Sequence, residues 1–194
     1  VSTVNHLFNF GISPDLIASE LLAVIAQRLV REICPVCKKA YKPDTQELRS
    51  IGIPDGQRTT FLCYKGTGCL NCDGTGYSGQ VGLYELFEPN TQLRSEIAKR
   101  RTTHDLKNLA VKAGMKTLLE DGIKKIHQGI TTIEEVARVC CAKCPGCGKA
   151  IPETEDICPF CQYWLYEVCG HCGAKLEIEW QVCPFCGTRK FSKE

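Results

Sequence analysis

The sequence lacks an apolar run long enough to cross a membrane, and it has almost no net charge. Its longest apolar stretch, "LIASELLAVIAQRLV", is interrupted by Glu20, Gln27 and Arg28, whereas a membrane-spanning helix needs about 20 predominantly apolar residues in a row. The formal net charge is +2, so composition gives no electrostatic reason to expect a nucleic acid or a membrane surface as a partner. These absences disfavour both an integral membrane protein and a nucleic-acid-binding protein.

A signal peptide and a set of residues arranged for catalysis are also missing. No leader precedes the first predicted helix, and position 1 is valine rather than methionine, so we expect the chain to belong to a longer protein. His104 and His127 each stand alone within a predicted helix. No nucleophile, base and orienting residue occur together, so no catalytic residues are predicted in this chain.

Cysteine, in contrast, is abundant and regularly spaced. Twelve of the 15 cysteines form six CxxC pairs. These pairs are Cys34/Cys37, Cys69/Cys72, Cys144/Cys147, Cys158/Cys161, Cys169/Cys172 and Cys183/Cys186. With no sign of secretion, one repeated spacing favours metal ligation over disulfide bonds. The remaining Cys63, Cys140 and Cys141 are predicted to be small buried apolar residues.

The last four pairs form an internal repeat. Residues 144–161 recur at 169–186, shifted by 25 positions, and each unit reads CxxC, ten residues, CxxC. Ten residues allow a tight hairpin that returns the second pair to the same ion, and Zn²⁺ takes four thiolates at about 2.3 Å in a tetrahedron. A unit this small cannot bury a core, so the metal must supply about 10 kcal/mol of folding free energy. The tail resembles the double zinc ribbon family.

Other interpretations of the tail are weaker. The "CPFC" motifs resemble rubredoxin iron sites, but rubredoxins separate their two motifs far more widely, and thiol redox chemistry suits a set of four cysteines less well than zinc does. His171 lies inside a CxxC pair, but four thiolates already complete the site, so we expect an exposed spacer. Trp164 and Trp180 are expected to cover the ribbons.

The first two pairs, Cys34/Cys37 and Cys69/Cys72, are separated by positions 38–68. One zinc ion held by both pairs would close a loop whose base is pinned between a helix and a strand. Cys63 is a competing ligand, but it has no partner at the CxxC spacing. The motif "CLNCDGTG" also matches DnaJ-type zinc fingers, which contain four copies where this chain has one, so that interpretation is disfavoured. The glycines are expected to turn the chain into the next strand.

Helical patterns dominate the part of the chain that ends at position 139. We expect helices over residues 1–11 and 13–32, the latter capped by Ser13, and a strand over 80–89. Four further helices are predicted over 91–100, 104–114, 118–129 and 133–139. Their predicted N-caps are Asn90, Thr103, Thr117 and Thr132, and Gly114 and Gly129 are predicted helix stops. The predicted class is therefore mixed α/β, mostly α, and helical signals end near residue 140.

The order of three segments resembles the C-terminal portion of type II secretion and type IV pilus assembly ATPases. These segments are "LIASELLAVIAQRLVREICPVC", "GCLNCDGTGYSGQVGLYELFE" and "MKTLLEDGIKKIHQGITTIEEVARV". The resemblance covers residues 1–139 and implies the C-terminal part of a RecA-like P-loop motor domain. It also implies an inserted zinc arm over residues 33–79, with Cys34, Cys37, Cys69 and Cys72 as ligands. Residues 140–194 would then be an appended double zinc ribbon.

The resemblance further implies a function for the parent protein. It would be a homo-hexameric, cytoplasmic ATPase at the inner membrane, working with a membrane platform protein to power pilin or pseudopilin assembly or type II secretion. No GxxxxGK[ST] motif occurs in the sequence, so ATP and Mg²⁺ are expected only in the full-length parent, and this chain alone is predicted to be inactive.

A competing hypothesis is a non-catalytic zinc-ribbon module that binds another protein. Residues 144–186 contain only Lys149 and Lys175 as basic residues, against six acidic ones. Nucleic-acid-binding ribbons usually cluster Lys and Arg with exposed aromatic side chains. An acidic ribbon repels phosphate, so the ribbons are expected to bind an unidentified protein. In total, three Zn²⁺ ions are predicted per chain.

Overall fold

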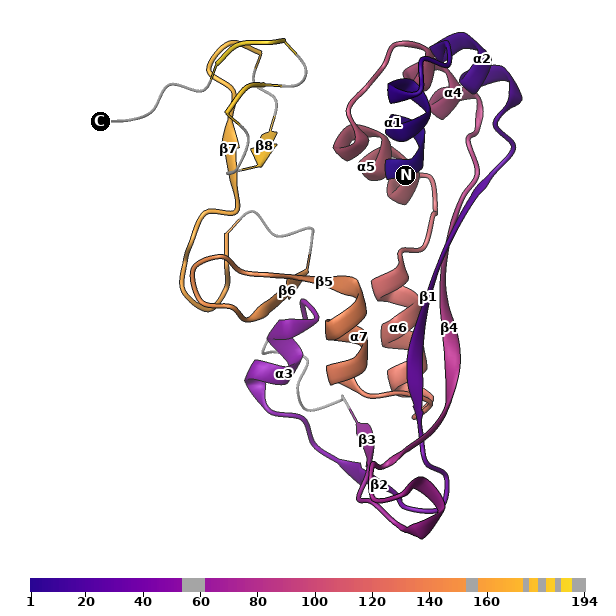
Figure 1. Ribbon diagram of the computed structural model, residues 1–194, viewed down its shortest axis with the longest axis vertical. Helices are drawn as coiled ribbons and strands as arrows, with labels where there is room; N and C mark the ends of the chain where they lie inside the picture. Colours follow the sequence, from indigo (N-terminus) through magenta and orange to yellow (C-terminus); the bar gives the residue numbers. More distant parts are fainter. Residues whose placement is uncertain (54–61, 153–156, 173–174, 178–180, 184–185, 190–194) are drawn as a thin grey trace.

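The computed structural model of the chain is a mixed α/β fold, as predicted (Figure 1). It describes residues 1–53, 62–152, 157–172, 175–177, 181–183 and 186–189. The elements, in chain order, are α1 (Ser2–Asn9), α2 (Pro14–Glu20), β1 (Val24–Ile33), β2 (Lys38–Tyr41), α3 (Thr45–Ser50), β3 (Cys63–Gly66), the 3-10 helix η2 (Leu70–Cys72), β4 (Tyr77–Phe87), α4 (Thr91–Ala98), α5 (Thr103–Lys112), α6 (Leu118–His127), α7 (Ile133–Cys140), β5 (Cys141–Lys143), β6 (Ala150–Pro152), β7 (Tyr166–Val168) and β8 (Lys175–Glu177).

The helix predicted over residues 13–32 is wrong beyond Glu20. Ser13 caps α2 as expected, but the chain becomes extended at Leu21 and continues as β1. β1 pairs antiparallel with β4, from Val24 opposite Phe87 onward. The apolar residues of this stretch fit helical spacing, yet several of them are β-branched and a partner strand is present elsewhere in the chain. Pairing with that strand therefore decides the conformation.

The strand predicted over residues 80–89 is confirmed, and it begins earlier, at Tyr77. Leu83 and Phe87 are buried on one face of β4, whereas Tyr84 and Leu86 are exposed on the other. This alternation has the two-residue period of a strand with one buried face. With 11 residues, β4 reaches from the cysteine-containing arm to the helices packed around Phe87 (Figure 1).

Two apolar cores lie along the β1–β4 sheet, one at its Phe87 end and one at its middle. The first packs α1, α2, α4 and α5 around Phe87 of β4. The second packs α3, α6 and α7 against Val30 of β1 and Leu83 of β4. Among the described residues the two cores share no buried side chain, so the β1–β4 sheet is the element that spans both.

The predicted N-caps of the four later helices are confirmed with one exception. Asn90, Thr117 and Thr132 each accept a hydrogen bond from the backbone N–H three residues later, as N-caps do. The cap of α5 is Thr102, not Thr103. Two consecutive threonines fit the capping pattern equally well, so the sequence does not distinguish them. Figure 1 shows α4 and α5 beside α1 and α2.

The two predicted helix stops are confirmed by their backbone conformation. Gly114 and Gly129 adopt φ values of 102° and 66°, which glycine tolerates at a helix end.

Within the described residues, none of the helices combines the length and apolar character needed to cross a membrane.

The carboxylate of Glu135 links α7 to β1. The residue is 0% exposed, and it accepts hydrogen bonds from the Arg31 backbone N–H at 2.9 Å and guanidinium at 2.8 Å, and from the Arg138 guanidinium at 3.0 and 2.7 Å. Burial opposes ionisation, but these bonds outweigh it and lower the pKa of Glu135 to about 2. Arg31 also stacks 4.0 Å from the ring centroid of Tyr77. One ionised carboxylate therefore connects α7, β1 and β4.

Replacing Glu135 with glutamine should destabilise the chain by about 2 kcal/mol, because the amide is uncharged and turns N–H donors toward the guanidinium groups. Urea denaturation at pH 7, followed by far-UV circular dichroism, measures this change. Glu134→Gln is the matched control, since Glu134 is exposed in the same helical turn, and it should change stability by less than about 0.5 kcal/mol. Equal stability of the two variants would contradict the role given to Glu135.

Candidate metal centres

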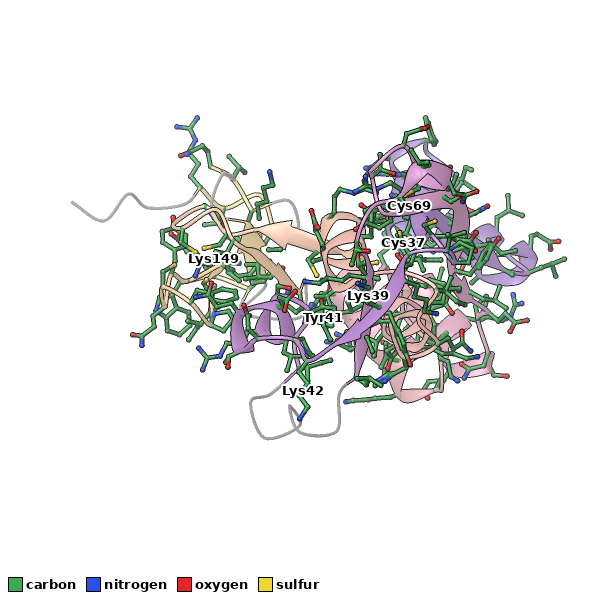
Figure 2. The ribbon with its side chains drawn as sticks, turned by 90° about the horizontal axis from the view of Figure 1, so that it is seen from below. Cys37, Lys39, Tyr41, Lys42, Cys69 and Lys149 are labelled. Atoms are coloured by element: carbon green, nitrogen blue, oxygen red, sulfur yellow. The ribbon has the colours of Figure 1, made fainter. Side chains whose placement is uncertain are left out.

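Four cysteines of the arm bring their sulfur atoms together at the end of the β1–β4 sheet. The Sγ atoms of Cys34, Cys37, Cys69 and Cys72 all lie within 4.8 Å of one another. The sulfur atoms of Cys34 and Cys69 are 3.8 Å apart, those of Cys37 and Cys72 3.9 Å, and those of Cys69 and Cys72 3.7 Å. Figure 2 shows Cys37 and Cys69 near each other. Four thiolates bound tetrahedrally at about 2.3 Å to one zinc ion are about 3.8 Å apart. The sulfur spacing therefore fits one zinc ion.

The two strands of the sheet place the two CxxC pairs opposite each other. Cys34 directly follows β1, and its backbone N–H donates at 3.0 Å to the carbonyl oxygen of Gly76, which directly precedes β4. β2 and β3 pair antiparallel within the arm, with Lys38 opposite Gly66. The structure brings the two pairs together as predicted. The base of the loop, however, lies between two strands and not between a helix and a strand.

Glycines turn the chain out of the second CxxC pair, as predicted. Gly74 and Gly76 have φ values of 75° and 79°, a region that residues with a side chain rarely adopt. The backbone N–H of Gly76 donates to the Sγ of Cys72 at 3.2 Å. The sequence pattern does not mark Gly66, yet a Cβ atom there would lie 2.0 Å from the carbonyl oxygen of Gly76. Its missing side chain therefore permits a close backbone approach.

The thiols of the arm differ in acidity. Burial opposes ionisation of Cys34, but hydrogen bonds from the side chain of Asn71 and from backbone N–H groups lower the pKa of Cys34 to about 6. Burial and the neighbouring thiol of Cys72 raise the pKa of Cys69 to about 11. Like charges this close oppose one another. A divalent cation would allow all four sulfur atoms to be present as thiolates.

The tail repeats its structure as well as its sequence. We call residues 141–164 the first ribbon and residues 166–189 the second ribbon. The β5–β6 pair of the first ribbon recurs as β7–β8, 25 positions later. The isolated bridge between Ile157 and Trp164 likewise recurs between Val182 and Arg189. The predicted tandem repeat is therefore confirmed at the level of backbone pairing.

Each ribbon gathers one set of four sulfur atoms within 4.8 Å. The sets are Cys144, Cys147, Cys158 and Cys161 in the first ribbon, and Cys169, Cys172, Cys183 and Cys186 in the second. Sulfur–sulfur distances of 3.6 and 3.7 Å in the first ribbon, and 3.6 Å twice in the second, again fit tetrahedral zinc coordination. In the first ribbon, Cys144 and Cys158 are buried and the other two cysteines are exposed.

The three cysteines that belong to no CxxC pair stand outside these sets in the described structure. Cys63 is 0% exposed and packs in the second core, as predicted, and burial raises the pKa of its thiol to about 12. Cys140 and Cys141 are only partly buried, so the expectation of full burial is wrong for them. The thiol of Cys141 donates to the carbonyl oxygen of Ser50 at 3.2 Å.

Expectations for the aromatic and histidine side chains have mixed outcomes. Trp164 is 65% exposed, so the prediction that it covers a ribbon is wrong. Trp180 lies outside the described residues. His171 is exposed, as expected for a spacer inside a CxxC pair. His104 and His127 are exposed on α5 and α6.

The fold and the three sets of cysteines define a class of protein. It is a mixed α/β chain with three sites at which four cysteines could bind zinc. Comparison with known families then places it more narrowly. Residues 144–187 match the family described as double zinc ribbon. Residues 1–138 match the family described as type II/IV secretion system protein, and the chain belongs to that family.

Individual relatives agree with this family. The chain is 41% identical to the type IV pilus assembly ATPase PilB of Thermus thermophilus over 133 residues, which are 69% of this chain and 15% of that protein. It is 38% identical to PilB of Myxococcus xanthus over 135 residues, 69% of this chain and 24% of that protein. It is 35% identical to the type II secretion system protein E of Pseudomonas aeruginosa over 139 residues, 72% of this chain and 27% of that protein. The chain thus matches between 15% and 27% of the length of these relatives.

Gly66→Ala should disrupt the arm, because the added methyl group would collide with the backbone of Gly76. We expect amide hydrogen exchange in β2 and β3 to become at least about tenfold faster. Gly170→Ala is the control, since a Cβ atom at Gly170 meets no atom within 4 Å. Unchanged exchange in the Gly66 variant would show that the close approach is not needed.

Proposed function

We propose that this chain is the C-terminal region of an ATPase that powers pilin or pseudopilin assembly or type II protein secretion. The observation that carries the proposal is the family match over residues 1–138, together with four clustered sulfur atoms on an arm between β1 and β4. In this proposal residues 1–139 complete a RecA-like motor domain, residues 33–79 are its zinc arm, and residues 140–194 are an appended double zinc ribbon.

The twelve paired cysteines hold three zinc ions in this proposal. Support comes from the sulfur–sulfur distances of 3.6–3.9 Å within the three sets, which match one tetrahedral ion per set. Zinc ligated by four thiolates has no open position for a substrate or water, so these ions stabilise structure and do no chemistry.

The ATP site belongs to another part of the parent protein. A P-loop cradles phosphates with backbone N–H groups and a lysine, and the sequence of this chain contains no such motif. The helices and the arm would instead complete subunit contacts in a homo-hexamer. The parent would act in the cytoplasm, peripheral to the inner membrane through its platform protein, and the arm would transmit motion between ATP-driven subunits and that partner.

The ribbons are proposed to bind a further protein. The exposed Trp164 borders an open hollow of about 450 Å³ where the first ribbon meets β7 of the second. The hollow is lined by Cys161, Gln162, Tyr163, Trp164 and Glu167. Exposed tryptophan and tyrosine side chains are enriched at protein interfaces, and the acidic composition of residues 144–186 disfavours a nucleic acid.

Purified under reducing conditions, the chain should contain three zinc ions by elemental analysis. Cys34→Ser should reduce the count to two, because the arm loses a ligand. Cys63→Ser should keep three, because Cys63 lies outside the sets of clustered sulfur atoms in the described structure. A wild-type content of one or none would contradict the three-site assignment.

The chain alone should show no Mg²⁺-dependent ATP hydrolysis above background, because no phosphate-binding loop is present in its sequence. A phosphate-release assay measures this. A chimera in which residues 1–139 replace the matching segment of the type IV pilus assembly ATPase PilB from Thermus thermophilus, which is 41% identical, should hydrolyse ATP. Turnover by the chain alone would overturn the assignment of the ATP site to another segment.

A further inference from the structure

The first ribbon packs against helix α3 of the arm. α7 ends at Cys140 and β5 begins at Cys141, so no linker separates the helix from the ribbon. In Figure 1, β6 lies beside α3, close to the end of α7. The ribbon and the arm are therefore in contact, although they lie far apart in the sequence.

The two faces of strand β6 pack against two different cores. Ile151 is 2% exposed and packs with the buried cysteines Cys144 and Cys158 of the first ribbon. Its neighbour Ala150 packs on the second core, which includes Leu48 and Ile51. Successive residues of a strand point to opposite faces. One short strand therefore joins the metal site of the ribbon to the core beneath α3.

Three more contacts fall on α3 or on the turn that follows it. Pro152 covers Gly52, where an added Cβ atom would lie 3.0 Å from the Cγ of Pro152. The Cys141 thiol bonds to the carbonyl oxygen of Ser50. The ammonium group of Lys149 donates to the side-chain oxygen of Gln46 at 3.4 Å (Figure 2). Both strands of the first ribbon thus contribute to this surface.

Helix α3 needs such support. It has six residues (Thr45–Ser50), and an isolated helix this short is not stable in water. Its capping box at Asp44 and Glu47 contributes about 1 kcal/mol, so burial of Leu48 and Ile51 against α7 and the ribbon must hold it in place. Removing the ribbon would uncover the side of this core on which Ala150 packs.

We propose that the first ribbon is an internal brace of the arm, and that metal binding in this ribbon determines how firmly α3 is held. The second ribbon has no such role. Figure 1 places β7 and β8 away from α3, so the second ribbon stays available to a partner. The inference depends on the proposed zinc ligation by Cys144, Cys147, Cys158 and Cys161.

Hydrogen exchange of the full chain, read by mass spectrometry, tests the brace. Cys158→Ser should cost one zinc ion and make exchange in residues 45–53 at least about tenfold faster. Cys183→Ser is the matched control, because Cys183 occupies the equivalent buried position of the second ribbon. It should also cost one zinc ion but leave residues 45–53 unchanged. Exchange in α5 reports whether the rest of the fold is intact.

A second pair of variants tests the contact without touching a cysteine. Ala150→Asp places a carboxylate against the core beneath α3 and should accelerate exchange in residues 45–53 while three zinc ions remain bound. Ala142→Asp is its control, since Ala142 is exposed on the paired strand β5. It should leave exchange unchanged.

The outcomes separate the two proposals. Unchanged exchange in residues 45–53 in both Cys158→Ser and Ala150→Asp, with the expected zinc counts, would overturn the brace alone. Retention of three zinc ions by both Cys158→Ser and Cys183→Ser would instead overturn the proposed metal ligation, and the metal-dependent brace with it.

Discussion

The antiparallel pairing of β1 with β4 positions the other described elements of the chain up to Cys140. One end of the sheet, at Phe87, completes a core of four helices, and its middle, at Val30 and Leu83, supports α6 and α7. Its far end places two CxxC pairs across from each other. The ionised carboxylate of Glu135 then fastens α7 to β1. Loss of strand pairing would separate both cores and disperse the arm's sulfur atoms.

The cysteine sites stabilise the chain through metal binding, whereas the cores do so through burial of apolar side chains. The pairing of β1 with β4, which sets Gln27 opposite Tyr84, requires long-range order, whereas each ribbon needs only a local hairpin and a metal ion. The arm combines the two, because its sulfur atoms converge only when β1 and β4 are paired. Metal binding in the arm therefore depends on the fold around it, whereas the ribbons depend mainly on their own ions.

The first ribbon combines a local metal site with packing against the rest of the fold. It repeats the second ribbon in sequence and in backbone pairing, yet it shares a surface with α3 and α7 through Ala150 and Pro152. In a protein of the type II/IV secretion system family, a brace of this kind would stiffen a projecting arm without adding a catalytic group. The second ribbon would extend the chain toward a partner. Two copies of one module would thus serve different purposes because their surroundings differ.

Much of the candidate site could be predicted from the sequence alone, because the spacing of the metal ligands is a local property of the chain. CxxC pairs separated by ten residues specify a hairpin around one ion, and caps such as Asn90 and Thr132 act within a single helical turn. The sequence did not determine whether residues 24–33 are helix or strand, because their apolar spacing suits both. Pairing with β4, which lies far along the chain, decides between the two. Contact between Ala150 and the core beneath α3 likewise depends on tertiary packing, which no local pattern encodes.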